Sequence, residues 1–209
     1  MNEHLVWVDC EMTGLDLKAD ALIEVAALVT DSELNVLGEG IQVVIRPPAE
    51  ALEQMGEFVR TMHDNSGLLP LLEGGLEMAE AEERVLAYIR EHVPEPRRAP
   101  LAGNTIGTDR AFLARDMPTL EAHVHYRNVD VSSLKELARR WYPRAYYNTP
   151  TKTGNHRALA DIQESIEELR YYREALFVAP PGLSTEALRE LAAKHQASIT
   201  GEKQPGDAN

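Results

Sequence analysis

Short apolar runs lie near the N-terminus, separated by polar segments that favour turns. Residues 4–8 (HLVWV), 22–30 (LIEVAALVT) and 41–47 (IQVVIRP) are three such runs. Runs of this length between turn signals are typical of buried β-strands. We therefore expect three early strands in one sheet, with the first strand as its central member.

Farther along the chain, apolar residues return at helical spacing. Val85, Ile89 and Val93 recur every four residues, which places them on one face of a helix. This helix would cross over from the three early strands to the next strand of the sheet.

Two strand–helix units follow this helix. Residues 99–104 (APLAGN) predict a short strand, after which a helical pattern continues until Pro118 breaks it. Segment 126–141 predicts a strand followed by a helix, with Ser132 or Ser133 as the N-terminal cap.

The last core helix is predicted within residues 154–173, where the apolar stripe advances by three, four and three residues: Leu159, Ile162, Ile166 and Leu169. Strands come first and strand–helix units follow. The sequence therefore predicts an α/β fold, with a mixed five-stranded sheet flanked by helices.

The character of the chain changes near Pro180. We expect one domain over residues 1–179 and a C-terminal extension over residues 180–209. The extension allows one short helix with Ser184 as its cap, and its last dozen or so residues are polar and contain glycine and proline. These final residues are predicted to be disordered.

Composition limits the possible partners. The chain has 209 residues, 21 Lys and Arg against 34 Asp and Glu, and a formal charge of -13. Such a charge argues against a long basic track along a polynucleotide. It leaves room for a short oligonucleotide, because few phosphates need neutralising and a metal site can supply local positive charge.

Cysteine content and hydropathy bear on location. Cys10 is the single cysteine, so no disulfide can form within the chain. The N-terminus has no basic segment followed by a long apolar core, and no stretch approaches the length of a membrane span. We therefore expect a cytoplasmic protein without a membrane segment.

Two carboxylates stand at the end of the first predicted strand. Asp9 and Glu11 are one residue apart, so they share one face of the strand while Cys10 points to the other. Ligand crevices in open α/β sheets lie beyond the carboxyl ends of the strands. The pair is therefore a candidate for a metal site, although solvated turn acids are the usual explanation of such a pattern.

A third carboxylate, Asp109, lies beside the apolar stripe of its own helix, because Phe112 and Leu113 follow it by three and four residues. Its side chain should therefore face inward. An inward carboxylate needs a cation, so either a metal or a salt bridge to Arg110 or Arg115 would account for it.

The fourth carboxylate, Asp161, begins the last core helix, and His156 precedes it by five residues. Five helical steps would place the two side chains about 140° apart. Asn155 is a plausible helix cap, which would leave His156 in a loop that can turn toward the same site.

The four acids and His156 together form a candidate two-metal centre. Hard oxygen ligands suit Mg²⁺ or Mn²⁺, and two such ions can stabilise both the attacking and the leaving oxygen of a phosphodiester. A neutral histidine could act as the general base.

The order of these motifs, DCE at 9–11, GNTIGTDRAFL around Asp109 and HRALAD at 156–161, resembles the DEDD exonucleases that use histidine. The segments VWVDCEMTGLD, YRNVDVSSLKELARRWYP and DIQESIEELRYYR resemble, more narrowly, the oligoribonuclease family. This resemblance extends over about residues 3–177.

The resemblance implies a ribonuclease H-like fold, a homodimer, and 3′-to-5′ removal of 5′-mononucleotides from very short RNA, especially dinucleotides. It implies that four acids hold two divalent cations and that a histidine is the general base. Those residues are the acids Asp9, Glu11, Asp109 and Asp161 and the base His156.

The resemblance also implies substrate contacts. Leu15 would wedge against the bases, His63 would meet the 5′ phosphate, and Thr105 would keep a hydroxyl where serine is common. Tyr126 and Arg127 would reach the substrate of a neighbouring subunit. Without the resemblance, Leu15 and Tyr126 would be packing residues, His63 a surface residue and Arg127 a solvated cation.

Two other functions remain open at this point. An exonuclease for longer single strands would share the metal centre but should show a basic or aromatic groove, and no such run is visible in the sequence. A silent binding domain would be expected to lack a ligand or the base, whereas all five residues are present.

Overall fold

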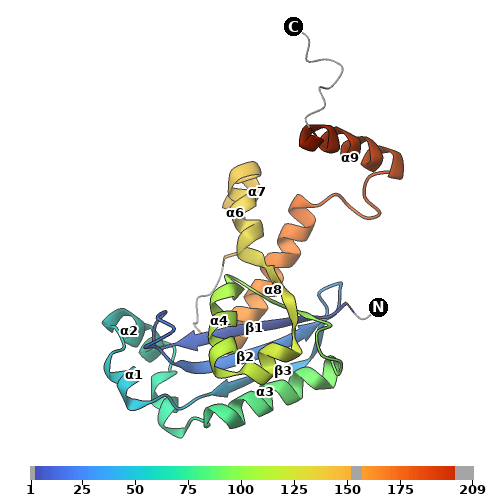
Figure 1. The fold of residues 1–209 in the computed structure, drawn as a ribbon. Helices are drawn as coiled ribbons and strands as arrows, with labels where there is room; N and C mark the ends of the chain where they lie inside the picture. Colours follow the sequence, from blue (N-terminus) through green and yellow to red (C-terminus); the bar gives the residue numbers. More distant parts are fainter. Residues whose placement is uncertain (1–2, 152–156, 201–209) are drawn as a thin grey trace.

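The computed structural model describes residues 3–151 and 157–200 (Figure 1). Its centre is one five-stranded sheet with helices on both faces. The strands are β1 (Leu5–Met12), β2 (Leu22–Thr30), β3 (Val36–Val44), β4 (Pro100–Gly103) and β5 (His125–Asp130). The longer helices are α3 (Met78–His92), α4 (Ile106–Asp116), α6 (Val131–Trp141), α8 (Ala158–Leu176) and α9 (Thr185–Thr200), and the shorter ones are α1 (Ala49–Glu53), α2 (Glu57–Asn65), the 3₁₀ helix η1 (Leu69–Gly74), α5 (Pro118–His123) and α7 (Pro143–Tyr147).

The strand order is β3-β2-β1-β4-β5, so β1 is the central strand as predicted. β2 pairs antiparallel with both β1 and β3, whereas β4 is parallel to β1 and to β5. Short connections produce the antiparallel part, and helical crossovers produce the parallel part. The predicted mixed five-stranded sheet is confirmed.

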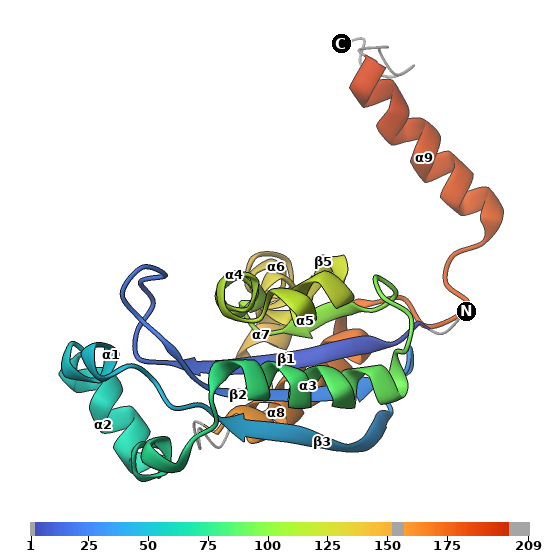
Figure 2. The same ribbon diagram turned by 60° about the horizontal axis from the view of Figure 1, so that its bottom comes forward.

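Each face of the sheet carries its own apolar core. On one face, side chains of β1 and β2 pack against α3, α4 and α5. On the other face, Trp7, Ala26 and Leu28 pack against α6 and α8. Figure 2 shows α3 and α8 on opposite sides of the sheet.

The alternation along β1 decides which face carries the acids. Val6, Val8 and Cys10 belong to the core beneath α3, whereas Trp7 belongs to the core beneath α8. Asp9 and Glu11 therefore lie on the α8 side of the sheet, because side chains alternate along a strand. The N-terminal end of α8 covers this part of β1.

Helix starts differ in one place from the prediction. α6 begins at Val131, and its cap is Asp130, whose carboxylate accepts the backbone N–H of Ser132 at 2.9 Å. The expected cap at Ser132 or Ser133 is therefore wrong, because β5 continues up to Asp130 and the helix starts immediately after it. The expected cap of the last helix is confirmed, since the Ser184 hydroxyl accepts the N–H of Ala187 at 3.2 Å.

Within the predicted extension, α9 comprises 16 residues and projects away from the sheet in both views (Figures 1 and 2). The division into a domain over residues 1–179 and an extension over 180–209 stays a prediction, and residues 201–209 lie outside the described part of the chain. Over residues 3–151 and 157–200, no helix has both the length and the apolar character of a membrane span.

Candidate metal centre

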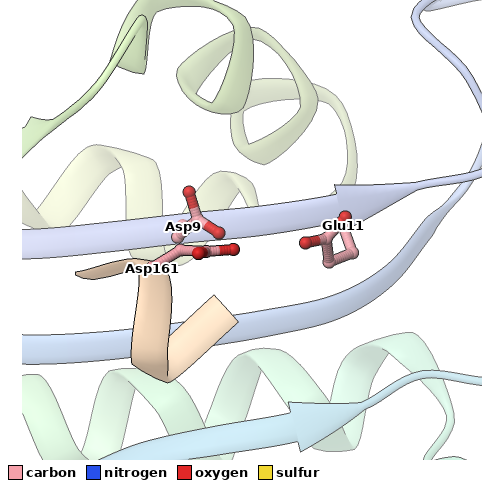
Figure 3. Close-up of side chains that lie close together, drawn as sticks. All are labelled: Asp9, Glu11 and Asp161. Carbon is pink, nitrogen blue, oxygen red and sulfur yellow. The ribbon is translucent and has the colours of Figure 1, made fainter. Parts of the chain in front are cut away.

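Three of the four predicted acids meet at the end of the central strand. Asp9 and Glu11 come from β1, and Asp161 comes from the first turn of α8. One ligand oxygen from each of them lies within 4.8 Å of the others, and Figure 3 shows the three carboxylates gathered between the strand and the helix. Oxygens that converge in this way from two separate elements are suited to a hard divalent cation.

The electrostatics of Glu11 reflect this crowding. Its side chain is 12 % exposed. Burial, followed by repulsion from Asp161, Glu24 and Asp109, raises the pKa of Glu11 to about 8, while the Arg157 guanidinium lowers it. The cluster therefore holds its full negative charge poorly by itself, and a cation would favour the ionised form.

The fourth acid, Asp109, reaches β1 from the opposite face of the sheet. It lies on α4, its side chain is buried, and one carboxylate oxygen accepts the backbone N–H of Cys10 at 3.0 Å. Burial raises the pKa of Asp109 to about 6, although hydrogen bonds from Cys10 act in the other direction. Asp109 thus contacts the one residue that separates Asp9 from Glu11.

The salt bridge considered for Asp109 is wrong. The guanidinium of Arg110 pairs with Glu121 at 2.7 Å, and that of Arg115 pairs with Asp116 at 2.6 Å. The buried Asp109 carboxylate interacts instead with Cys10. Its role as a metal ligand stays a prediction.

The predicted base, His156, lies outside the described residues, as does the predicted cap Asn155. The chain is described again from Arg157, which occupies the cap position of α8 without a side-chain cap of its own. Arg157 pairs instead with Glu24 of β2, with the guanidinium Nη2 and the carboxylate Oε1 3.0 Å apart.

Glu24 is a residue that the sequence pattern did not single out. It lies within the apolar run LIEVAALVT, directly across from Glu11 in the register of β1 and β2, and it is fully buried. The signal that could have identified Glu24 is its place as a lone carboxylate inside an otherwise apolar strand, because a buried charge requires a partner.

Leu15 lies on the turn between β1 and β2, and its side chain is 75 % exposed. The turn is held by Asp20, whose carboxylate accepts the Thr13 hydroxyl at 2.9 Å and the Asp16 N–H at 2.9 Å. Gly14 is required here, because a Cβ at this position would collide with the Asp20 carboxylate. A rigid turn therefore presents an apolar side chain to solvent beside the acids of β1.

His63 is placed differently from a surface histidine. It lies on α2, is fully buried, and its Nε2 is 2.9 Å from the carbonyl oxygen of Met12. Its Nδ1 is 3.9 Å from Oε2 of Glu11. In this conformation His63 contacts the end of β1, and its contact with a 5′ phosphate stays a prediction.

Thr105 adopts a left-handed backbone conformation, with φ of 54°, between β4 and α4. Its N–H donates to Asp130 and to Ser132, each at 3.0 Å, and its hydroxyl lies 3.1 Å from that of Ser132. This conformation is energetically unfavourable for a residue other than glycine, so the three contacts are needed to hold the exposed Thr105 in it.

Tyr126 and Arg127 lie on β5, which is an edge strand of the sheet. The Tyr126 side chain is 72 % exposed, and the Arg127 guanidinium lies 5.5 Å from the centre of its ring. Neither belongs to the acid cluster of β1 and α8, because β4 lies between β1 and β5 in the sheet. These residues present an aromatic and cationic surface to whatever binds at the sheet edge.

Known proteins match both the sequence and the fold. Residues 6–169 match the protein family described as Exonuclease. The oligoribonuclease of Streptomyces coelicolor is 69 % identical over 95 % of this chain and 99 % of its own length. The oligoribonuclease of Cutibacterium acnes is 66 % identical over 94 % of this chain and 98 % of its own length.

Among solved structures, exonuclease I from E. coli in its zinc-bound complex with single-stranded DNA superposes with a TM-score of 0.64, at 16 % identity over 84 % of this chain. Exonuclease I from Methylocaldum szegediense gives a TM-score of 0.57 at 23 % identity over 83 % of this chain. This chain spans 41 % of the length of each, and the likeness shows the same ribonuclease H-like fold. With the sequence matches above, it follows that the chain belongs to the oligoribonuclease family, a family of metal-dependent exoribonucleases.

Proposed function

We propose that this protein is a 3′-to-5′ exoribonuclease that hydrolyses short oligoribonucleotides, especially dinucleotides, to 5′-mononucleotides in the cytoplasm. The observation that carries the proposal is the meeting of Asp9, Glu11 and Asp161 at the end of the central strand, in a chain of the oligoribonuclease family. Ligands of open α/β sheets generally bind beyond the carboxyl ends of the strands, which supports an approach of a phosphodiester to these carboxylates.

Asp9, Glu11, Asp109 and Asp161 would hold two divalent cations, Mg²⁺ or Mn²⁺. Three of these acids already converge, and Asp109 is anchored to the intervening residue Cys10. When bound, such cations supply Lewis acidity and charge stabilisation to the phosphodiester. The chain's own contribution is a set of carboxylates from β1, α4 and α8 whose mutual repulsion favours cation binding.

His156 would act as the general base. Its imidazole accepts a proton from water as the water oxygen bonds to phosphorus and the bond between phosphorus and the 3′ oxygen breaks. The departing 3′ oxygen takes a proton from solvent water, so the products would be a 5′-mononucleotide and an RNA shortened by one residue with a free 3′ hydroxyl. Since Arg157 is the next residue and is held by Glu24, the chain directly after His156 is fixed near the acids.

The proposed substrate contacts fit two bases. The exposed Leu15 would separate or pack against the bases, and the exposed Thr105 would offer its hydroxyl. His63 would bind the 5′ phosphate, which requires neighbouring side chains to move because its ring is fully buried. A site that captures the terminal phosphate with charge-assisted hydrogen bonds rewards substrates whose 5′ end arrives there.

We further propose a homodimer in which Tyr126 and Arg127 serve the partner's substrate. Their exposure on an edge strand supports this, because an exposed strand edge with a large aromatic side chain is suited to contact with a second chain. The aromatic ring would stack on a base of the RNA held in the partner's site.

Substrate length tests the proposed function. A 5′-labelled RNA dinucleotide and a roughly 20-nucleotide RNA are each incubated with the protein in Mn²⁺ or in chelator. We expect the protein to hydrolyse the dinucleotide much faster than the long RNA. The reason is that a chain of charge -13 offers a long RNA little additional binding. Both reactions should stop in chelator. Equal or better cleavage of the long RNA would indicate an exonuclease for longer strands, and no cleavage of either would indicate a silent binding domain.

Mixing of subunits tests the shared site. Tyr126→Ala and Asp9→Ala proteins should each have little activity. Dissociating, mixing and reassociating them should restore up to about a quarter of wild-type activity. The reason is that about half of the dimers then contain one subunit of each kind, and one of the two sites in such a dimer is complete. The control replaces the Asp9→Ala subunit with one that carries both substitutions. Recovery that is absent, or that equals the control, would contradict the arrangement across subunits.

A further inference from the structure

We propose that Glu24 and Arg157 are positioning residues for the metal centre: the buried ion pair between them sets the start of α8, and with it the place of Asp161. Neither residue belongs to the predicted ligand set. This inference rests on the proposed function in taking Asp161 as a metal ligand, and its main consequence concerns cation binding. Four observations support it.

First, Glu24 joins three separate elements. Its carboxylate oxygens accept Arg157 Nη2 at 3.0 Å, the backbone N–H of Ala158 at 3.1 Å, and the side-chain amide of Gln42 at 2.9 Å. Arg157 Nε approaches the same carboxylate at 3.4 Å. These donors come from β3 and from the N-terminal end of α8, so a single side chain on β2 ties the helix start to the sheet.

Second, Glu24 acts as a cap for α8. Arg157 occupies the cap position but makes no side-chain cap hydrogen bond of its own, and the first N–H groups of a helix need acceptors from outside the helix. The Glu24 carboxylate accepts the N–H of Ala158, and its negative charge lies at the positive end of the helix dipole. A carboxylate of the sheet therefore helps to set where the helix begins.

Third, the connection to Asp161 is direct. The carbonyl oxygen of Arg157 accepts the backbone N–H of Asp161 at 3.1 Å and that of Ala160 at 2.9 Å. Whatever fixes Arg157 therefore fixes the first turn of α8, on which Asp161 lies.

Fourth, stability alone does not explain the pair. Glu24 is fully buried and lies opposite Glu11, so it adds a negative charge beside a cluster of acids. Buried ion pairs are weak contributors to stability, because desolvation offsets their attraction. An apolar side chain would suit this strand better unless the carboxylate were needed to set geometry.

The effect of Glu24 and Arg157 on cation binding could come from positioning of Asp161 or from their charges alone, and the two explanations predict opposite results for Arg157→Gln. Glu24→Gln does not separate them: it removes a negative charge near the acids, so both explanations predict weaker cation binding. Arg157→Gln removes a positive charge, so electrostatics alone predicts tighter cation binding. Positioning predicts weaker binding in both variants, because either substitution breaks the pair that holds the first turn of α8.

The experiment measures the apparent Kd for Mn²⁺ of the full-length protein by calorimetry, and confirms folding by thermal melting. Loss of a residue that orients metal ligands typically costs about 10–100-fold in metal affinity, and this is the expected weakening for Glu24→Gln and Arg157→Gln. The matched control is Glu33→Gln, which breaks the exposed pair with Arg173 near the other end of α8, with N···O of 3.2 Å. Its Mn²⁺ affinity should equal that of the wild type.

Arg157→Gln decides the outcome if Glu24→Gln does not fold, because the Arg157 side chain is 31 % exposed whereas that of Glu24 is fully buried. Unchanged or tighter Mn²⁺ binding by Arg157→Gln would overturn the inference. The proposed function is tested separately, since Mn²⁺ binding is measured without RNA. If the wild type hydrolyses the dinucleotide, both variants should also show a lower kcat at saturating Mn²⁺ with an unchanged KM.

Discussion

Replacement of His156 by alanine is expected to lower kcat for an RNA dinucleotide by about 10²–10⁴-fold, the range typical of losing a general base. The acids stay in place in this variant, so Mn²⁺ binding and dinucleotide binding should remain close to those of the wild type. The measurements are steady-state hydrolysis at saturating Mn²⁺ and calorimetric titration with a non-hydrolysable dinucleotide.

His195→Ala is the matched control, because His195 is exposed and belongs to α9, which projects away from the sheet (Figure 1). Its kcat should not change. A His156→Ala protein with wild-type kcat would remove His156 from the role of base. Loss of dinucleotide binding in proportion to the loss of kcat would instead assign His156 to substrate binding.

Replacement of Asp161 by asparagine should have the second large effect. Asp161 supplies one of the three converging carboxylates, and the amide keeps its shape while removing its charge. Cation stabilisation of a phosphodiester transition state contributes several kcal/mol, so the loss of a ligand should lower kcat by at least about 10²-fold. Hydrolysis of the dinucleotide at several Mn²⁺ concentrations measures this effect.

Glu174→Gln is the control for Asp161→Asn, since Glu174 is an exposed carboxylate near the C-terminal end of the same helix. It should retain wild-type kcat. If Asp161→Asn were as active as this control, Asp161 would not be a metal ligand. Recovery of Asp161→Asn at higher Mn²⁺ would indicate that weakened cation binding, and not misfolding, causes the loss.

Local patterns were sufficient to predict much of the fold. The continuous apolar run before Asp9 predicted a buried central strand, and the stripe through Ile162 and Ile166 predicted a helix packed on the sheet; both are confirmed. Strand alternation also placed Asp9 and Glu11 on one face, which the structure bears out by bringing them together with Asp161. Periodicity reports which face of an element is buried, and that is what these predictions required.

Contacts between distant segments could not be predicted in this way. Arg110 and Arg115 are neighbours of Asp109 in sequence, yet they pair with Glu121 and Asp116, because the helix turns them away from the buried face. On pattern alone His63 would be a surface residue, but it is buried on α2 against the end of β1. Spacing along one element carries no information about the element packed against it.

Glu24 shows the same limit at the candidate site. A glutamate in an apolar strand predicts a partner but not its identity, and Arg157 is 133 residues away in sequence. The cap of α6 at Asp130 was missed for a related reason, because Asp130 is both the last residue of β5 and the N-terminal cap of α6. In both cases the deciding hydrogen bonds depend on how elements meet.

The number of Mn²⁺ ions bound per chain tests the metal centre most directly. Calorimetric titration of the wild type at neutral pH should give about two ions per chain, the number that a two-metal hydrolytic site requires. The same titration of Asp161→Asn should lose at least one of them, while Glu174→Gln should match the wild type. A wild-type protein that binds no Mn²⁺, or an Asp161→Asn protein that binds it as the wild type does, would contradict the assignment of these acids as the metal centre.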